Sequence, residues 1–245
     1  MTTRVSILGV AIDNLTEPEA IERIAGWVAS RQPHQIVTVN PEFVIEARRN
    51  AGFRRVLAAA DMATPDGSGL MLAARLRRTP LRQRVTGVAL TRLIAREAAR
   101  QQWRVFFLGA APGVAEQAAA VLAREYPGFV AAGCYAGSPR PADEAHIREI
   151  VQAARPDVLL VAYGHPHQDL WLARNQPFLR VPVTMGVGGT FDEIAGIVPL
   201  APAWMHRLGL KWLFRLPTQP RRWRRILDAV PVFLWYVLTE RASEE

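Results

Sequence analysis

The sequence predicts an α/β fold: a Rossmann-like parallel sheet covered by helices, with a basic, Trp-rich helical C-terminal appendage. Short apolar runs of strand length alternate with helical patterns as far as Pro199. The runs are continuously apolar, which is typical of parallel strands buried on both faces. Beyond Pro199 the alternation stops, and a segment rich in arginine and tryptophan begins. We therefore expect an α/β domain over residues 1–199 and an appendage over residues 200–245.

Each element follows from its local pattern. The predicted strands are Val5–Ile12, Gln35–Val39, Arg104–Leu108, Val130–Tyr135, Val158–Ala162 and Val183–Gly186. The predicted helices are Pro18–Arg31, Pro41–Ala60 in one or two pieces, Gly67–Arg77, Val88–Gln101, Pro112–Tyr126, Asp143–Ala154 and Gln168–Gln176. Pro18 lies near the first turn of its helix, where a missing N–H is tolerated, and Asp143 is an expected N-cap.

Composition limits the classes of protein. Hydrophobic residues make up 50% of the chain and charged residues 21%, as in a globular protein. The net charge of +8 is compatible with nucleic acid, an anionic membrane or a phosphorylated substrate as partner. The single cysteine, Cys134, excludes an intramolecular disulfide and a multi-thiolate metal site, and a reducing compartment fits. Since no run of about 18 apolar residues occurs, we expect no spanning helix.

The C-terminal segment concentrates cations and tryptophans. No acidic residue lies between Ala203 and Arg225, and the last 45 residues hold four of the seven tryptophans. An anionic lipid surface attracts this combination. The arginines expected at the membrane or at a diphosphate are Arg207, Arg215, Arg221, Arg222, Arg224 and Arg225. The alternative is a solvated basic helix whose tryptophans pack inward.

Glycines mark three of the turns between a strand and the following helix. Ligands of parallel sheets bind beyond the carboxyl ends of the strands, where backbone N–H groups and helix dipoles favour an anion such as a diphosphate. The glycines concerned are Gly109, Gly164, Gly186, Gly188 and Gly189. Any one of these turns can need glycine for its geometry alone, so it is their coincidence at one edge that indicates a site. Neither GxGxxG nor GxxxxGKS/T occurs, which disfavours dinucleotide and P-loop enzymes.

Asp66 lies in the segment Thr64-Pro65-Asp66-Gly67, just before a predicted helix. Pro65 disfavours helix at the residue before it, so Asp66 is expected on a constrained loop. Two interpretations stay open for its carboxylate. It is either an N-cap of the following helix or a general base that takes a proton from a hydroxyl nucleophile.

A metal site is not expected. His165 and His167 have a spacing that a metal could use, but no nearby cysteine or third histidine completes a ligand set. No Asp-x-Asp motif of the kind that holds a divalent ion on a nucleotide diphosphate is present. Cationic side chains and backbone amides would have to neutralise such a diphosphate.

At these residues the chain resembles the WecG/TagA/CpsF family, glycosyltransferase family 26, from Val5 to Arg225. The motifs that support the resemblance are Thr38-Val39-Asn40-Pro41, Thr64-Pro65-Asp66-Gly67, Gly164-His165-Pro166-His167-Gln168-Asp169-Leu170-Trp171, Gly186-Val187-Gly188-Gly189-Thr190-Phe191-Asp192 and Gly209-Leu210-Lys211-Trp212-Leu213-Phe214-Arg215-Leu216. The resemblance implies an inverting, metal-independent transfer of a hexose or N-acetylhexosamine (ManNAc-, ManNAcA- or Glc-type) from a UDP-sugar. The implied acceptor is a polyprenyl-diphosphate-linked saccharide used for cell-surface polysaccharide, at the cytoplasmic face of the plasma membrane.

The resemblance also implies roles for single residues. Asp66 matches the family's proposed base. Thr38, Asn40 and Gln168 match polar residues of the acceptor pocket. Tyr135 and Asp192 fall where the uridine is held, and Gly164 and Pro166 belong to the same nucleotide site. The basic appendage brings the enzyme to the membrane and completes the site over the diphosphate. The oligomeric state stays open, a homo-oligomer included.

The chain departs from the family pattern at four positions. Asp169 stands where Glu is expected, Ala89 where Asp is usual, Leu200 where Arg is usual, and Lys211 where Glu is usual. These differences affect the identity of donor and acceptor more than the class of reaction.

Two other classes of protein share parts of the pattern. Basic residues mixed with aromatic ones also suit single-stranded nucleic acid, although here they are terminal and no nucleic-acid motif accompanies them. A nicotinamide-dependent oxidoreductase would have the same strand–helix alternation, but the glycine fingerprint and the acidic ribose ligand are missing. We therefore expect neither nucleic acid nor a nicotinamide cofactor as partner.

Overall fold

A six-stranded, wholly parallel sheet forms the centre of the molecule, in the order β4-β3-β8-β7-β5-β6. The computed structural model describes residues 3–199, 202, 205, 213–214, 223 and 228–240. The strands are β3 (His34–Val39), β4 (Met62–Pro65), β5 (Val105–Gly109), β6 (Ala131–Tyr135), β7 (Val158–Ala162) and β8 (Val183–Gly186). The predicted α/β class and parallel sheet are confirmed.

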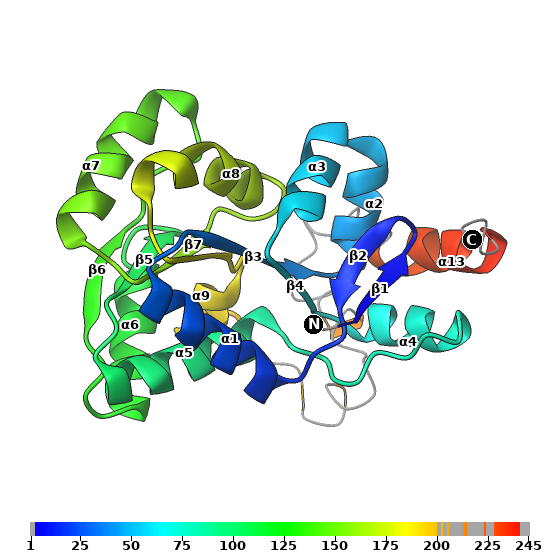
Figure 1. Cartoon of the computed structure of the whole chain (residues 1–245), viewed down its shortest axis with the longest axis horizontal. Helices are drawn as coiled ribbons and strands as arrows, with labels where there is room; N and C mark the ends of the chain where they lie inside the picture. Colours follow the sequence, from blue (N-terminus) through cyan, green and yellow to red (C-terminus); the bar gives the residue numbers. More distant parts are fainter. Residues whose placement is uncertain are drawn as a thin grey trace.

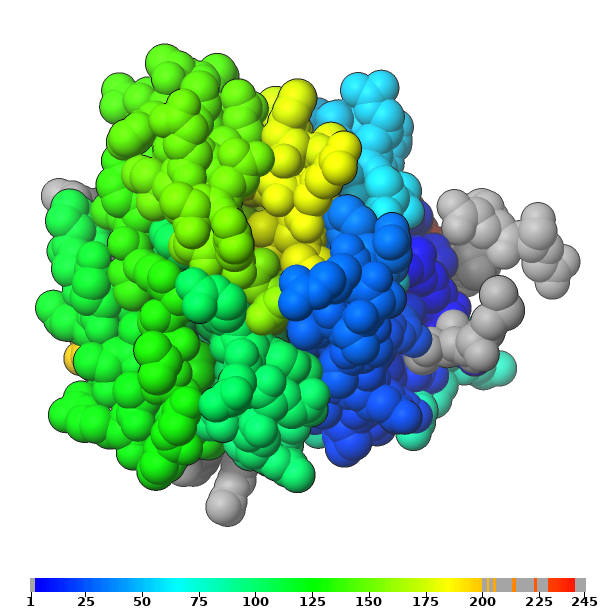
Figure 2. Space-filling model, turned by 60° about the vertical axis from the view of Figure 1, so that its left-hand side comes forward, coloured from blue at the N-terminus to red at the C-terminus, as the bar shows by residue number. Residues whose placement is uncertain are grey.

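Helices cover both faces of the sheet (Figure 1). One face carries α1 (Glu17–Ser30), α5 (Gly87–Gln101), α6 (Val114–Glu125) and α9 (Thr190–Ile194), and the other carries α2 (Pro41–Arg49), α3 (Ala51–Ala59), α7 (Glu144–Ala154) and α8 (His167–Leu179). On β5, Phe107 packs toward α5 and α6, whereas Phe106 and Leu108 pack toward α7 and α8. Both faces of the strand are buried, which explains its continuously apolar sequence. Figure 2 shows the blue N-terminal segment packed against the green middle of the chain, where α1 contacts α5.

The N-terminal apolar run forms a hairpin outside the main sheet. The prediction of one strand over Val5–Ile12 is wrong, because β1 (Arg4–Ile7) pairs antiparallel with β2 (Val10–Asp13). Leu8 and Gly9 between them have φ angles of 50° and 79°. Two consecutive positive φ values are typical of a two-residue hairpin turn, which reverses the chain within the apolar run.

β4, which contains Pro65, was not among the predicted strands. The structure places β4 at the edge of the sheet, with Pro65 in register with Val39 of β3. Proline lacks an N–H and is tolerated on an edge strand, where one side of the ladder needs no donor. Asp66 directly follows the end of β4, in the two-residue link to the next helix, which agrees with the predicted constrained loop. The helix α4 (Ser68–Leu76) comes next.

The remaining predicted elements begin and end within three residues of the observed ones. The expected helical region Pro41–Ala60 divides at Asn50, whose side chain accepts a hydrogen bond from the Phe53 N–H and caps α3. Asp143 occupies the N-cap position of α7, but its carboxylate accepts from the Ser138 hydroxyl instead of capping the helix.

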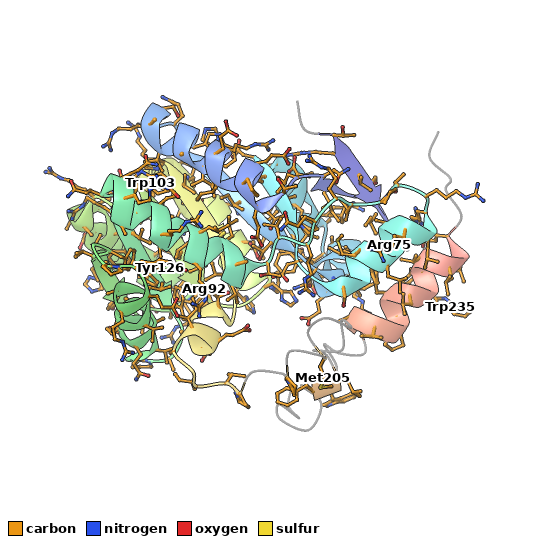
Figure 3. The ribbon with its side chains drawn as sticks, turned by 90° about the horizontal axis from the view of Figure 1, so that it is seen from below. Arg75, Arg92, Trp103, Tyr126, Met205 and Trp235 are labelled. Atoms are coloured by element: carbon orange, nitrogen blue, oxygen red, sulfur yellow. The ribbon has the colours of Figure 1, made fainter. Side chains whose placement is uncertain are left out.

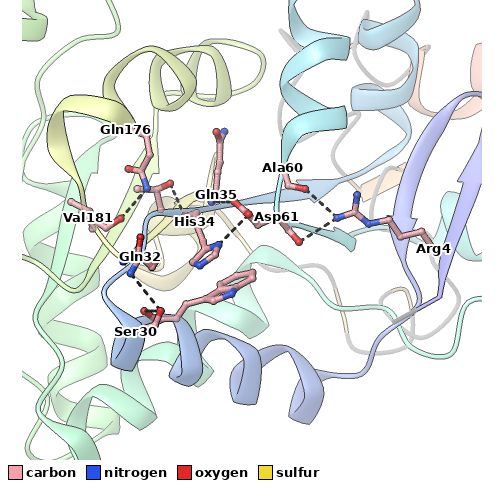
Figure 4. A network of polar contacts seen from close by, with 11 residues as sticks. Arg4, Ser30, Gln32, His34, Gln35, Ala60, Asp61, Gln176 and Val181 are labelled. Carbon is pink, nitrogen blue, oxygen red and sulfur yellow. Dashed lines mark hydrogen bonds and ion pairs between the residues drawn. The ribbon is translucent and has the colours of Figure 1, made fainter. Parts of the chain in front are cut away.

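A polar network fixes the amino-terminal ends of β3 and β4 (Figure 4). Asp61 accepts a hydrogen bond from the Gln35 N–H at 2.8 Å, and its carboxylate lies 3.1 Å from Nδ1 of His34. Arg4 of the hairpin donates to the carbonyl oxygens of Ala60 and Asp61 at 3.1 and 3.2 Å. These bonds set the register at the end of the sheet opposite to the carboxyl ends.

The described part of the C-terminal region is helical and packs on the α/β domain. A π-helical turn (Asp228–Val232) leads into α13 (Phe233–Thr239), which buries Phe233 and Val237 in a cluster shared with α2, α3 and α4. The six arginines predicted at the membrane, with Leu200 and Lys211, lie outside the described residues. The boundary at residue 199 therefore stays a prediction. Within the part of the chain that the structure describes, no helix is both long and apolar enough to cross a membrane.

Candidate functional site

Asp66 stands at the carboxyl edge of the sheet, directly after β4. Its N–H donates to the Val39 carbonyl oxygen at 2.6 Å, and its Oδ2 accepts from the Gly87 N–H at 3.0 Å. Gly87 is the first residue of α5, so the carboxylate lies at the positive end of that helix dipole, where a negative charge is favoured. The N-cap of α4 is Gly67, so the interpretation of Asp66 as the N-cap of the following helix is wrong.

Two hydroxyl groups lie beside Gly87. A β-carbon at Gly87 would lie 3.4 Å from Thr190 Oγ1 and 3.6 Å from Thr38 Cγ2. Thr38 is buried, and its hydroxyl donates to the Gly186 carbonyl oxygen at 3.2 Å. The Thr190 hydroxyl donates to the Val187 carbonyl oxygen at 2.7 Å. The ends of β3, β4 and β8 therefore meet at the N-terminus of α5, with the Asp66 carboxylate among them.

Gln168 joins the turns that follow β7 and β8. Its side chain is buried, and Oε1 accepts hydrogen bonds from the N–H groups of Gly164 at 3.1 Å and Gly188 at 2.8 Å. The expectation that glycine amides face an open cleft is therefore wrong for these two residues, because each amide is already bonded within the protein. Gly164 and Gly188 have φ angles of 75° and 55°, which explains the glycines by backbone conformation.

The other predicted glycines also serve the packing of the turns. Gly109 has a φ of 101°, and a β-carbon there would lie 2.8 Å from the carbonyl carbon of Ala162 on the adjacent β7. Gly186 ends β8 and packs against Gln168, while Gly189 is the N-cap of α9. Glycine at these positions lets the neighbouring backbone and side chains approach closely.

Asp169 lies beneath the same turns. Its carboxyl group is fully buried, and neither oxygen has a hydrogen-bond partner among the described residues. Burial raises the pKa of this carboxyl to about 7, because the charged form is poorly solvated there. The neighbouring Gln168 amide opposes the shift in part, without the geometry of a hydrogen bond. A β-carbon at Gly186 would lie 2.6 Å from Asp169 Oδ1, so the carboxyl lies directly against the end of β8.

Asn40 and Pro166 are the N-cap residues of two helices, α2 and α8, that begin at this edge of the sheet. The Asn40 Oδ1 accepts from the Phe43 N–H at 3.1 Å and caps α2. Pro166 follows a cis peptide bond after His165, and its carbonyl oxygen accepts from the Leu170 N–H in the first turn of α8. Each residue therefore sets the direction of a helix whose N-terminus points at the site.

The predicted uridine residue Tyr135 lies at the end of β6, on the sheet edge opposite to β4 and Asp66. Its ring packs edge-on against His146, and the two ring centroids lie 6.1 Å apart.

Tyr163, which follows β7, was not expected at the site. Its phenol oxygen is buried and has no hydrogen-bond partner in the described structure, and burial raises the pKa of the phenol. Asp192 is half-buried on α9, after β8. A ligand that contacts both Asp66 and Tyr135 has to lie across the strand ends.

Sequence reasoning also missed a polar contact between Glu42 and His165. The Nε2 of His165 lies 3.6 Å from Glu42 Oε2, and the imidazole ring packs on Phe43 with 4.9 Å between centroids. The pair joins the start of α2 to the turn after β7. His165 stands in a quoted motif and Glu42 directly follows another, but their proximity depends on β3 and β7 flanking β8, which the sequence does not reveal.

The structure therefore brings together Asp66, Thr38 and Gln168 with the turns of Gly164, Gly186 and Gly188. Ala89, where the family usually has Asp, donates its N–H to Thr86 Oγ1 at the start of α5. Among the described residues, no group of three His, Cys, Asp or Glu side chains could hold a metal ion. The site thus offers a carboxylate and hydroxyl groups.

Comparison with known proteins shows the family to which this chain belongs. Residues 5–245 match the family described as "Glycosyl transferase WecG/TagA/CpsF family". A Bacillus spizizenii protein is 36% identical over 209 residues, which cover 85% of this chain and 80% of the relative. A Bacillus subtilis protein is 32% identical over 210 residues, 86% of this chain and 81% of the relative, and a Staphylococcus aureus protein is 30% identical over 240 residues, 96% and 92%. All three are named N-acetylglucosaminyldiphosphoundecaprenol N-acetyl-beta-D-mannosaminyltransferase.

Proposed function

Because the chain belongs to the WecG/TagA/CpsF family of glycosyltransferases, we propose that it transfers a sugar from a UDP-sugar to a saccharide carried on a polyprenyl diphosphate. The names of the relatives give the acceptor as N-acetylglucosaminyl-diphosphoundecaprenol and the transferred sugar as N-acetylmannosamine. This acceptor and this transferred sugar are the first combination to test for activity. The departures at Ala89 and Asp169 lie at the site edge and make the choice of sugar worth measuring over several donors.

The position of Asp66 is the observation that best supports the proposal. Its carboxylate lies at the carboxyl edge of the sheet and at the N-terminus of α5, where Thr38 and Thr190 lie near Gly87. A base must be held within hydrogen-bond reach of the hydroxyl that it deprotonates. The bonds to Val39 and Gly87 fix the backbone and the side chain of Asp66 at this edge of the sheet.

In the proposed mechanism Asp66 removes the proton from the acceptor hydroxyl as that oxygen attacks the anomeric carbon. The attack comes from the face opposite to UDP, so the configuration inverts. Negative charge grows on the departing diphosphate, and arginines of the C-terminal region stabilise it. Gln168 acts as a positioning residue because it holds the turns of Gly164 and Gly188 together.

Two further parts of the proposal concern metal and membrane. Transfer is expected to continue after EDTA treatment, since the proposed charge stabilisation uses no metal ion. Attachment to the inner face of the plasma membrane is expected from Arg207, Arg215 and the arginines between residues 221 and 225. Each arginine near an anionic surface contributes about 1 kcal/mol, and the attraction weakens as the salt concentration rises.

Membership in a glycosyltransferase family argues against both alternatives drawn from the sequence. A nicotinamide-dependent oxidoreductase would need a dinucleotide site, and a nucleic-acid-binding protein would use its basic residues without a reaction. Absorbance titration with NAD(P)H and a gel-shift at physiological salt test the two directly, and we expect no binding in either.

The substitution Asp66→Asn tests the proposal. A positioned base contributes about 10²–10⁴ in rate, so turnover should fall by about that factor. The amide oxygen of Asn can still accept from the Gly87 N–H, so the fold and UDP binding should remain. Turnover is measured with UDP-N-acetylmannosamine and a short-chain polyprenyl-diphosphate N-acetylglucosamine, and UDP binding by calorimetry.

Glu125→Gln is the matched control, because it removes a carboxylate that pairs with Arg92 on the surface of α5 and α6. Its turnover should equal that of the unmodified enzyme. Unchanged turnover by Asp66→Asn would remove Asp66 from the role of base. The absence of heat with UDP and with every UDP-sugar would refute the proposed donor.

A further inference from the structure

The last described helix, α13, is attached to the α/β domain at both of its ends. At its beginning, Phe233 is fully buried, and its Cε1 atom lies 3.8 Å from the position that a β-carbon at Gly69 would take. The carbonyl oxygen of Ala229, in the preceding π-helical turn, lies 3.9 Å from the same position, and Pro41 Cγ lies 2.8 Å from it. The beginning of α13 therefore packs against the first turns of α2 and α4.

Polar contacts hold the other end of α13. Arg48, near the end of α2, donates from Nη1 and Nη2 to the two carboxylate oxygens of Glu240 at 2.9 and 2.5 Å, and its guanidinium lies 4.2 Å from the centroid of the Tyr236 ring. Arg77, directly after α4, donates from Nη2 to the Glu240 carbonyl oxygen at 2.7 Å. We call these contacts of Arg48, Arg77, Tyr236 and Glu240 the clasp. A bidentate arginine–carboxylate pair fixes direction as well as distance, so the clasp defines where α13 ends.

The two attachments show that α13 runs in the same direction as α2 and α4. Its beginning lies at the beginnings of both helices, and its end lies at their ends. Figure 3 shows α4 and α13 side by side, with Arg75 and Trp235 labelled on them. α2 and α4 begin directly after β3 and β4, and Gly69 lies three residues after Asp66. The chain that enters α13 therefore reaches the helix at the carboxyl edge of the sheet, near the candidate base.

The basic segment, residues 203–225, is attached near this edge on both sides along the chain. Before it, the Ile197 N–H donates to the carbonyl oxygen of Asp192 on α9, the helix that follows β8, at 3.0 Å. After it, the π-helical turn begins at Asp228 and leads into α13. Arg225 stands three residues before Asp228, and three fully extended residues span at most about 11 Å. The position of α13 therefore limits how far the last arginines of the basic segment can lie from the strand ends.

We propose that the clasp is a positioning device for sugar transfer, because it holds the last arginines of the basic segment near the strand ends, where a nucleoside diphosphate departs. Arg48 and Arg77 are then positioning residues. They act through α13 and lie at those ends of α2 and α4 that are remote from Asp66. Each of these helices has nine residues and is about 13 Å long, so the clasp lies about one helix length from the reacting atoms. The inference rests on the proposed function, since the diphosphate is that of the proposed donor.

A fixed position matters for the arginines because of when the charge develops. Cations stabilise a leaving diphosphate most when they are already in place as its negative charge grows. A segment attached at one end only would have to be ordered in each reaction, at a cost in conformational entropy. The clasp avoids this cost, since buried Phe233 and Val237 and the paired Glu240 order the chain that follows the arginines before any ligand binds.

Hydrogen exchange of the α13 amides, measured on the full chain, reports how firmly the helix is docked. Glu240→Lys places a third cation beside Arg48 and Arg77, and the lost ion pair and the new repulsion together should speed exchange about tenfold. Phe233→Ala acts at the other end of α13, removes a fully buried ring and should speed exchange about 100-fold or more. Glu240→Lys combined with Arg48→Glu restores an opposite pair, for which a pocket of about 780 Å³ lined by both side chains leaves room. Its exchange should return to within about threefold of the unmodified protein.

A second ion pair of similar exposure supplies the control. Arg92 of α5 pairs with Glu125 of α6, and their side chains are 36% and 34% exposed, against 32% and 40% for Arg48 and Glu240. Arg92 on α5 lies far from Trp235 on α13 (Figure 3). Glu125→Lys should therefore leave both the exchange of α13 and the turnover at the values of the unmodified protein.

Turnover with a UDP-sugar and a short-chain lipid-linked acceptor then separates positioning from mere stabilisation. Each variant is assayed at a temperature where circular dichroism shows it folded. kcat should fall in the order of the exchange rates, by about tenfold for Phe233→Ala and less for Glu240→Lys, and the double variant should recover it. KM should change less, because the arginines act chiefly on charge that develops in the transition state. Unchanged kcat in Phe233→Ala despite faster exchange would overturn the positioning role, and unchanged exchange in Glu240→Lys would overturn the clasp.

Calorimetry with UDP and with uridine gives a readout that needs no sugar transfer. Glu240→Lys should weaken UDP binding about threefold and leave uridine binding unchanged, because only UDP carries the diphosphate that the arginines meet. If the variants weaken UDP binding in this way but no UDP-sugar reacts even with the unmodified protein, the clasp stands and the proposed function fails. If transfer proceeds at an unchanged rate while α13 is released, the proposed function stands and the clasp fails. A protein that neither binds UDP nor transfers a sugar would overturn both.

Discussion

The buried carboxyl of Asp169 makes stability depend on pH in a way that one substitution can test. Burial raises the pKa of this carboxyl to about 7, whereas an aspartate in an unfolded chain has a pKa of about 3.9. Between these two values the folded state keeps a proton that the unfolded state has lost. The contribution to stability is therefore fully present below about pH 4 and is lost as the pH rises through about 7.

The size of this effect follows from the separation of the two pKa values. Three pH units at 1.36 kcal/mol each give about 4 kcal/mol in the free energy of unfolding, of which about 3 kcal/mol falls between pH 5 and pH 8. Asp169→Asn removes the titrating group and keeps the shape of the side chain. The difference in unfolding free energy, variant minus unmodified protein, should rise by about 3 kcal/mol over that range. The buried amide donors of Asn shift the absolute value but not this slope.

Urea unfolding followed by circular dichroism at half-unit pH steps measures the slope. Glu149→Gln on the exposed side of α7 is the control and should reproduce the pH dependence of the unmodified protein. Parallel curves for Asp169→Asn and the unmodified protein would refute the reasoning. They would mean that the carboxyl is ionised in the folded state, with a solvating partner that the geometry does not contain.

Three further predictions concern single contacts. Asn40→Ala should lower the free energy of unfolding by about 1 kcal/mol, because α2 loses its cap, and Asn40→Asp should not; equal stability of all three proteins in urea would contradict this. Gly186→Ala should destabilise by about 1–3 kcal/mol, because the new carbon would lie 2.6 Å from Asp169 Oδ1 and Gln168 Nε2, while Gly26→Ala in α1, where nothing lies within 4 Å, should stabilise. Burial raises the pKa of the Cys134 thiol to about 11, so at pH 8 it should react with a thiol reagent about 200-fold more slowly than in guanidinium chloride. A difference below about tenfold would show that the thiolate is more available than its burial allows.

The residues of the candidate site were largely predictable, but their partners were not. Thr38 and Gln168 stand in motifs at predicted strand ends, and parallel strands bring such ends to one edge. Asp66 was predicted on a constrained loop before a helix, and only the structure shows that this loop follows a strand of the same sheet. The hydrogen bonds from the Gly164 and Gly188 amides to Gln168 form because β7 and β8 are neighbouring strands. The order of strands in the sheet cannot be read from the hydrophobic pattern of the sequence. For the same reason the pairing of Glu42 with His165 was not expected.

The sequence by itself determined the alternation of strands and helices, because apolar runs and helical periodicity are local properties of a few consecutive residues. It also determined which side chains follow the strands. Tertiary structure alone decided that β4 is an edge strand that tolerates Pro65 and that the first apolar run folds into a hairpin. It also decided that arginines of α2, of α3 and of the residue after α4 line one pocket. These features depend on contacts between distant segments, whose free energies are set by the packing of the whole domain.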